Sequence, residues 1–208
     1  MTTIVRAFLL STVLLYANAT ATNAQTRTSH LWGEFAVDYG RASFSCDVCT
    51  YRRVTGTNST QLDGWGFSGG FGWTSNRHIR VGIEYRSWLN GLKGGDSLPG
   101  IDMGQLFVSY SPRIRTGLFV EAGGALTHYT LGLGTGNPIE PHKRADLFAA
   151  GYGWGYGLGV GWQNRSGLTP RLTYLHGREH RVHAAGGSTV ATGWKQSMLF
   201  IEIGYRTP

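Results

Sequence analysis

Glycine occupies every second position from Gly151 to Gly161, and each glycine is followed by a large apolar residue. Because a β-strand sends successive side chains to opposite faces, this segment would have one broad apolar face and one nearly bare face. The segment carries no charge and also suggests a transmembrane helix. A helix, however, would scatter the glycines around its circumference, and each interior glycine would cost about 1 kcal/mol relative to alanine. The pattern therefore predicts a strand with one face toward lipid and the other toward a crowded interior.

The same period of two recurs along the chain and predicts eight strands. They cover residues 31–40, 64–74, 78–88, 103–111, 117–129, 148–162, 168–176 and 193–205. Short turns alternate with long polar segments at 41–61, 89–100, 130–145 and 177–191. This alternation is typical of an antiparallel meander, and within a bilayer only helices and closed barrels satisfy every backbone hydrogen bond. We therefore predict an all-β fold, an eight-stranded antiparallel up-and-down transmembrane β-barrel.

Charged residues well inside the predicted strands all lie on the face opposite the apolar residues. They are Glu34, Asp38, Arg80, Glu84, Arg86, Glu121, Arg171 and Glu202. A basic residue facing lipid near the midplane costs about 2–4 kcal/mol, whereas opposite charges inside a barrel can offset their desolvation. We predict a lumen charge network of these eight residues. The lumen of an eight-stranded barrel is narrow enough for side chains to fill. The glycines would give clearance to lumen-facing Arg and Glu, with Arg, Trp, Phe or water in the remaining space.

Outward-facing aromatic residues gather toward the predicted strand ends. Trp73, Tyr110, Trp162 and Tyr205 lie near the short turns, and Tyr39, Trp65, Tyr85 and Tyr174 lie near the long segments. Tyr and Trp favour the boundary between lipid and water, so these two sets predict an aromatic girdle at each interface.

The first 24 residues predict a secretory signal peptide. One positive charge precedes a short apolar run, and small residues follow, with cleavage fitting after Ala24 or Ala21. Residues 25–208 would then form the barrel domain. The formal net charge of +7 could suggest a nucleic-acid partner, but export and the lack of basic runs longer than two residues argue against one. An anionic lipid or lipopolysaccharide surface is the better partner.

The signal peptide, strand count, alternation and turn asymmetry together resemble the small eight-stranded outer-membrane β-barrels of the OmpA transmembrane-domain and OmpX type. The resemblance covers about residues 30–205 and rests on no diagnostic motif. It implies a place in the outer membrane of a Gram-negative-type bacterium, and we predict a monomer. Members of the family usually end on an aromatic residue that the assembly machinery reads. Here Tyr205 is followed by three more residues, so the signal would be shifted or imperfect.

Two clusters in the long segments invite a chemical interpretation. In an exported protein, Cys46 and Cys49 predict a small disulfide, with unpaired thiols as the alternative; a zinc site would need a second ligand pair nearby. His176, Glu179, His180 and His183 lie close in sequence and could bind a transition metal, but their spacing matches no strong motif. We therefore predict a solvated loop there, with no metal and no cofactor.

The predicted role is structural or surface-binding, through the four long segments and without enzymatic activity. Some relatives of this size are lipid-modifying enzymes of the lipid A deacylase or acyltransferase type, with Ser or His near the loop rim. Here His128, His176 and Ser197 have that chemistry, and His176 pairs with Ser197 only if adjacent strands align accordingly. A narrow channel and a soluble lipocalin-like carrier are the remaining alternatives.

Overall fold

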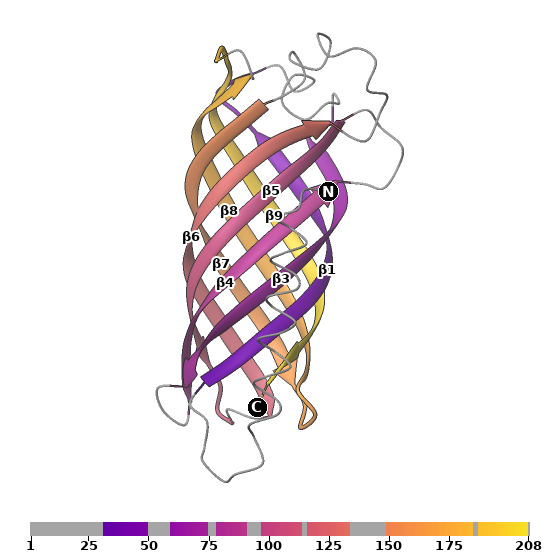
Figure 1. Ribbon diagram of the computed structural model, residues 1–208, viewed down its shortest axis with the longest axis vertical. Helices are drawn as coiled ribbons and strands as arrows, with labels where there is room; N and C mark the ends of the chain where they lie inside the picture. The colour runs from indigo at the N-terminus through magenta and orange to yellow at the C-terminus, as the bar shows by residue number, and fades with distance from the viewer. Residues whose placement is uncertain are drawn as a thin grey trace.

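The computed structural model describes residues 31–49, 59–74, 78–90, 97–113, 116–133, 149–184 and 187–207 (Figure 1). The predicted signal peptide, residues 1–24, lies outside the described residues. No helix in the described part of the chain is long and apolar enough to cross a membrane.

The described chain forms a closed barrel of eight long antiparallel strands (Figure 1). They are β1 (Leu31–Ser45), β3 (Gln61–Thr74), β4 (Ile79–Asn90), β5 (Ser97–Tyr110), β6 (Gly117–Leu133), β7 (Ala149–Gln163), β8 (Leu168–Ala184) and β9 (Thr189–Arg206). Each strand pairs with the next, and β1 pairs with β9 to close the barrel. A short strand, β2 (Val48–Cys49), extends the sheet beside β9. The predicted fold class is confirmed.

Side chains alternate between lipid and lumen along the strands, as the period of two predicts, except near the loop rim of β8 and β9. In β1, for example, Phe35 and Val37 are exposed while Glu34 and Asp38 are buried. The most exposed of the large apolar side chains include Leu126 and Ile201, at 74% and 68%. A soluble lipocalin-like carrier would need the reverse arrangement, with charged residues outside.

The strands continue well past the predicted ends on one side of the barrel. We call this side, at the top of Figure 1, the loop rim, and the side where β1 begins and β9 ends the short-turn rim. The predicted long loop at 177–191 is wrong, because β8 runs to Ala184 and β9 starts at Thr189. The predicted loops at 41–61, 89–100 and 130–145 also begin too early or end too late, since β1, β5 and β6 extend into them. Their central residues lie outside the described residues.

The polarity of the two faces reverses near the loop rim, which explains the misplaced strand ends. There the outward residues include the ion-paired Arg41 and Asp63, whereas the lumen-facing Phe44 and Trp194 are buried. The predicted strands therefore end where the outward apolar residues end, although the hydrogen-bonded strands continue past that point.

The lumen is filled in two layers. The half toward the short-turn rim holds buried charges, described below. The half toward the loop rim holds an apolar plug, in which Trp194 packs 5.1 Å from Phe44 and 5.2 Å from Tyr129 between ring centroids. The other plug members are Ala42, Trp88, Ile101, Met103, Ala125, Leu175, Val182, Ala191, Met198 and Phe200.

Several lumen-facing glycines make room for aromatic rings. Gly72 and Gly82 are cross-strand partners, and a Cβ on Gly82 would lie 2.5 Å from Cζ2 of Trp32. A Cβ on Gly161 would similarly lie 2.5 Å from the ring of Phe119. Other lumen-facing glycines lie against carboxylates, as predicted, since a Cβ on Gly66 would clash with Oδ1 of Asp38 and one on Gly159 would lie 3.5 Å from Oε2 of Glu121.

Candidate functional site

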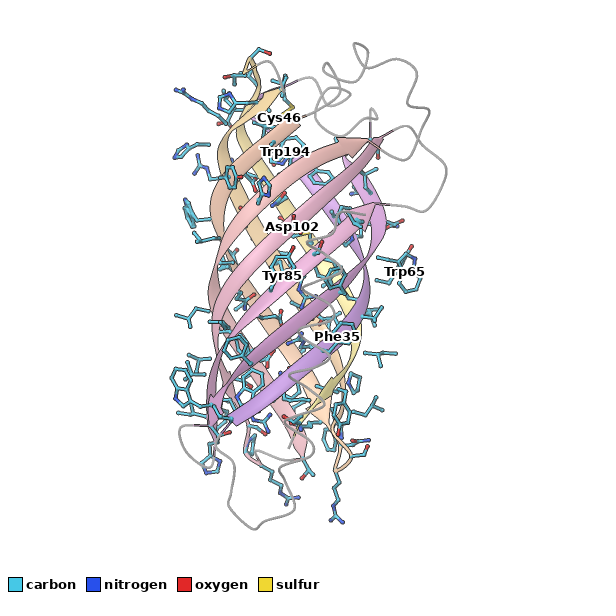
Figure 2. All side chains as sticks on the ribbon, viewed as in Figure 1. Phe35, Cys46, Trp65, Tyr85, Asp102 and Trp194 are labelled. Atoms are coloured by element: carbon cyan, nitrogen blue, oxygen red, sulfur yellow. A yellow bond between two sulfur atoms is a disulfide. The ribbon has the colours of Figure 1, made fainter. Side chains whose placement is uncertain are left out.

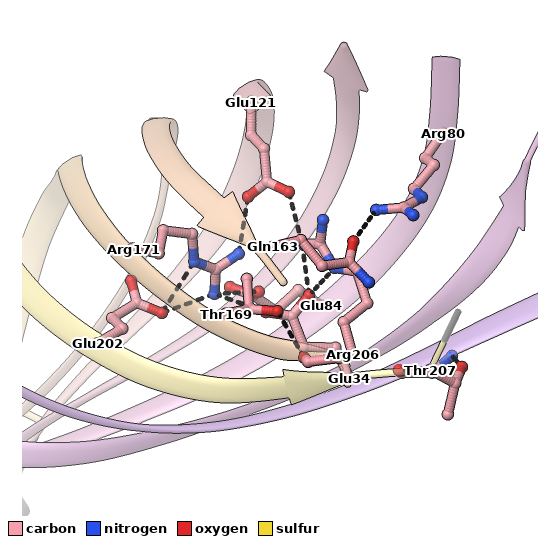
Figure 3. Close-up of polar contacts among 12 residues, drawn as sticks. Glu34, Arg80, Glu84, Glu121, Gln163, Thr169, Arg171, Glu202, Arg206 and Thr207 are labelled. Carbon is pink, nitrogen blue, oxygen red and sulfur yellow. Dashed lines mark hydrogen bonds and ion pairs between the residues drawn. The ribbon is translucent and has the colours of Figure 1, made fainter. Parts of the chain in front are cut away.

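Arg171 is the centre of the buried ionic layer (Figure 3). Its guanidinium lies within ion-pair distance of four carboxylates: Glu202 at 2.6 Å, Glu121 at 2.7 Å, Glu84 at 2.9 Å and Glu34 at 3.6 Å. The Arg171 side chain is 3% exposed, so its charge is compensated by protein groups rather than by bulk water. These carboxylates come from β1, β4, β6 and β9, so one guanidinium ties together strands around the whole barrel.

Arg86 extends the ionic layer toward the loop rim. It donates to Asp38 at 2.9 Å, to Glu84 at 2.9 Å and to Glu202 at 3.0 Å. Its guanidinium carbon also lies 5.1 Å from the ring centroid of Phe200, a member of the apolar plug. Arg86 therefore stands where the charged and apolar layers meet.

Arg206 closes the network near the short-turn rim, and sequence reasoning missed it. It donates to Glu34 and, at 2.6 Å, to Glu121. Its guanidinium carbon lies 4.7 Å from the ring centroid of Phe119 and 5.3 Å from that of Trp32. The period of two places Arg206 on the lumen face with Glu202, although the predicted strand ends one residue earlier, at Tyr205.

Arg80, the remaining residue of the predicted network, is buried nearer the short-turn rim. It donates to Oε1 of Gln163 at 2.8 Å (Figure 3). The other seven predicted residues lie in ion pairs with one another and with Arg206. Among the described residues that form this network, three guanidinium groups thus serve five carboxylates, all of them buried.

The outward aromatics form two belts, with the second lower than predicted. Trp73, Tyr110, Trp162 and Tyr205 lie at the short-turn ends of their strands. Tyr39, Trp65, Tyr85 and Tyr174 lie well before the loop-rim ends; Trp65 points outward in Figure 2. Tyr39 contacts Trp65 across β1 and β3, with ring centroids 5.0 Å apart. The prediction that this second belt lies beside the loops is wrong, because the strands extend past it toward the loop rim.

Polar groups lie immediately beyond the second belt on the outer face. Tyr85 donates to Asp102 at 2.7 Å (Figure 2), and His128 lies stacked 4.2 Å from Tyr152. The nearest carboxylate oxygen to His128 is that of Asp102, at 3.9 Å from Nδ1. The transition from apolar to polar side chains marks where a bilayer would end.

The outer faces of β8 and β9 form an ordered ladder across this boundary. From lipid side to loop rim, the outward cross-strand pairs are Leu172–Ile201, Tyr174–Leu199, His176–Ser197 and Arg178–Lys195. Nδ1 of His176 lies 3.0 Å from Oγ of Ser197, and Oη of Tyr174 donates to the same Oγ at 3.3 Å. The strands thus align in the way that the sequence left open. His128 takes no part, because it lies on β6 against Tyr152.

The structure also describes the predicted cysteine pair and the predicted histidine cluster. Cys46 and Cys49 form a disulfide, with their Cα atoms 6.1 Å apart. His180 and His183 are exposed on β8, and Nδ1 of His183 lies 3.4 Å from Oγ1 of Thr189. Within the residues that the structure describes, no group of three or more His, Cys, Asp or Glu is arranged to hold a metal ion. Glu179 points into the lumen, where Thr127 and Gln196 donate to it.

No protein-family model matches the chain, and no curated protein matches its sequence. Among solved structures, it is similar to Neisserial surface protein A, with a TM-score of 0.52 and 13% identity over 83% of this chain and 96% of that one. It is also similar to Ail, the attachment invasion locus protein of Yersinia pestis, with a TM-score of 0.51 and 11% identity over 85% and 98% of the two chains. The chain has the fold of the small eight-stranded outer-membrane β-barrels.

Proposed function

We propose that this protein is a sealed, monomeric barrel of the outer membrane of a Gram-negative-type bacterium, and that it acts at the outer surface rather than as a channel. The filled lumen is the observation that carries this proposal. An ion crossing the barrel would have to displace both the network around Arg171 and the plug around Trp194, which are buried.

The ionic layer is a poor conduction path despite its polarity. Four of its five carboxylates lie in ion pairs with two guanidinium groups each, and Glu202, for example, accepts from Arg86 and Arg171. Breaking one partner away from a buried pair leaves an uncompensated charge, which costs several kcal/mol. The plug above it is mostly apolar, and the buried Glu179 beside it already accepts hydrogen bonds from Thr127 and Gln196, so a permeating ion would find little to replace its hydration shell.

The surface role falls to the loop rim and to the polar outer face just beyond the second aromatic belt. Arg178 and Lys195 lie there as cross-strand neighbours, and Lys195 is 40% exposed. Cationic side chains at this height suit the phosphates of lipopolysaccharide or another anionic lipid, which we propose as the lipid partner. The predicted surface binding through the loops at 41–61, 89–100 and 130–145 rests on central residues that lie outside the described part of the chain.

Conductance in planar bilayers tests the sealed lumen. We expect the full-length protein to insert without discrete single-channel steps, while a 16-stranded porin, which encloses an aqueous channel, gives them under the same conditions. Reproducible steps from the wild-type barrel would show that water and ions pass the two layers, and the sealed-barrel proposal would be wrong.

A further inference from the structure

The outer ladder of β8 and β9 places a nucleophile beside a base at the edge of the lipid-facing surface. Ser197 and His176 are direct cross-strand partners, and both are partly exposed on the outside of the barrel. Tyr174 donates its hydroxyl hydrogen to Oγ of Ser197, which leaves the serine hydrogen free to point at Nδ1 of His176. A serine that donates to an imidazole nitrogen is the arrangement that activates serine for attack on an acyl carbon.

An apolar groove lies directly on the lipid side of this pair. It has a volume of about 260 Å³ and is lined by Leu158, Gly159, Val160, Leu172, Tyr174 and Leu199. Tyr174 and Leu199 form the cross-strand pair that precedes His176 and Ser197, so the groove ends beside the hydroxyl. Because it opens on the lipid-facing surface, an acyl chain of the surrounding lipid would fit there.

Two cations lie on the opposite side of the pair. Arg178 and Lys195 face each other one outward position further, about 7 Å along the strands from His176 and Ser197. Like charges directly opposite each other destabilise a sheet unless an anion compensates them. Asp47 lies 3.9 Å from Nζ of Lys195, but Nε of Arg178 has no hydrogen-bond partner among the described residues. An anionic headgroup beside Lys195, which is 40% exposed, would supply the compensating negative charge.

We propose that His176 and Ser197 form a catalytic pair that hydrolyses a carboxylic ester of an anionic, acylated lipid of the outer leaflet. The ladder matches the order of groups in such a lipid: acyl chain in the groove, ester at Ser197, headgroup charge at Arg178 and Lys195. This inference rests on the proposed outer-membrane placement and adds an activity to it. It departs from the non-enzymatic role that the sequence predicts.

The reaction is a two-step acyl transfer to water. Oγ of Ser197 bonds to the ester carbonyl carbon while its proton passes to Nδ1 of His176. The intermediate then breaks its bond to the leaving oxygen, and His176 returns the proton, so that an alcohol departs. Water attacks the acyl-serine with His176 again as the base, releasing a carboxylic acid and restoring Ser197. One ester and one water become one acid and one alcohol.

A fluorophosphonate probe and a chromogenic ester test the pair in the detergent-solubilised full chain. We expect the probe to add once to the wild type, as read by intact mass, and not to Ser197→Ala. Hydrolysis of para-nitrophenyl palmitate should fall to background in Ser197→Ala and by about 10²–10⁴-fold in His176→Gln. Ser43→Ala is the matched control, because Ser43 is the cross-strand partner of Ser197 on β1. It should keep wild-type labelling and turnover.

Two lipid arms identify the natural ester. Mixed micelles of phosphatidylglycerol and of lipopolysaccharide are each incubated with the wild type, and released fatty acid is measured by mass spectrometry. Release in one arm identifies that source. Arg178→Gln should raise KM for the cleaved anionic lipid about tenfold and raise KM for the neutral chromogenic ester much less, because that ester carries no charge to pair with Arg178.

Two outcomes would contradict the catalytic pair. If the wild type takes up no probe and releases no acid in either arm, or if Ser197→Ala is as active as the wild type, the pair is only a surface hydrogen bond. All variants are first checked for the heat-dependent gel shift of a folded barrel. If the wild type shows the gel shift but hydrolyses no ester, the catalytic proposal is wrong and the proposed barrel function is unaffected. If the wild type shows no gel shift, the barrel itself is contradicted.

Discussion

Replacing Arg171 with methionine is expected to lower the free energy of unfolding by about 3–5 kcal/mol, because removing one partner of a buried ion-pair network leaves uncompensated buried charge. Arg171 is in ion-pair distance of Glu34, Glu84, Glu121 and Glu202. The carboxylates of the described network already outnumber its guanidinium groups, so the loss increases an existing excess of negative charge. Urea-induced unfolding in lipid vesicles, followed by tryptophan fluorescence, measures the change.

Arg41→Met is the matched control for this substitution. Arg41 also pairs with a carboxylate, Asp63 at 2.7 Å, but the two side chains are 61% and 43% exposed. Exposed pairs contribute little and are screened by salt, so the unfolding midpoint should hardly move. Adding Glu202→Gln to Arg171→Met should recover part of the lost stability, since it removes one stranded charge. Equal effects of Arg171→Met and Arg41→Met would show that the lumen charges do not hold the barrel together.

Gly82→Leu is the second substitution with a large expected effect. A Cβ at this position would lie 2.5 Å from Cζ2 and 2.8 Å from Cη2 of Trp32, and 2.8 Å from the backbone oxygen of Phe71. The indole cannot retreat far, because its ring centroid already lies 5.6 Å from that of Phe107. Overpacking of a dense interior costs about 1–3 kcal/mol and can cost more, so a large fraction of the variant should fail to fold.

Gly104→Leu provides the comparison at an outward glycine. A Cβ on Gly104 meets nothing within 4 Å, and its side chain would enter the lipid-facing surface. We expect this variant to fold as well as the wild type, with the folded fraction read from the unheated band on a gel. Similar loss in Gly82→Leu and Gly104→Leu would contradict the assignment of the two faces.

The barrel itself could be predicted from the sequence because lipid imposes one strict rule on it. Apolar side chains must face outward over the full thickness of the bilayer, so Trp65, Leu106 and Ile201 mark their strands without any structural knowledge. The same rule places Glu34 and Arg171 in the lumen. Both the strand positions and the lumen placement follow from side-chain alternation alone, without knowledge of which residues contact each other.

The strand extensions could not be predicted by that rule, because it ceases to apply beyond the second aromatic belt. There the outer face meets water and the lumen becomes apolar, so the pattern around Val182 and Trp194 resembles that of a soluble barrel. Arg206 was missed for a related reason, since its role depends on how far β9 continues past Tyr205. The sequence could have indicated this role, because the period of two puts Arg206 on the same lumen face as Glu202.

The pairing of His176 with Ser197 lay beyond sequence reasoning, because cross-strand register depends on turn geometry. A shift of one residue would put either side chain on the opposite face. The turn between β8 and β9 is short and includes Gly187 with a φ of 80°, a left-handed conformation that favours glycine. Together with the shift in register at Val182 and His183, it sets which residues of the two strands meet.

Heat-dependent gel mobility of the detergent-extracted full-length protein tests the closed membrane barrel most directly. A barrel closed by the β1–β9 pairing should resist mild detergent without heating and keep a compact shape. We predict that the unheated protein migrates at a different apparent mass from the boiled protein, and that boiling converts one band into the other. A single band with the same mobility before and after boiling would contradict the closed barrel and every role proposed for its two faces.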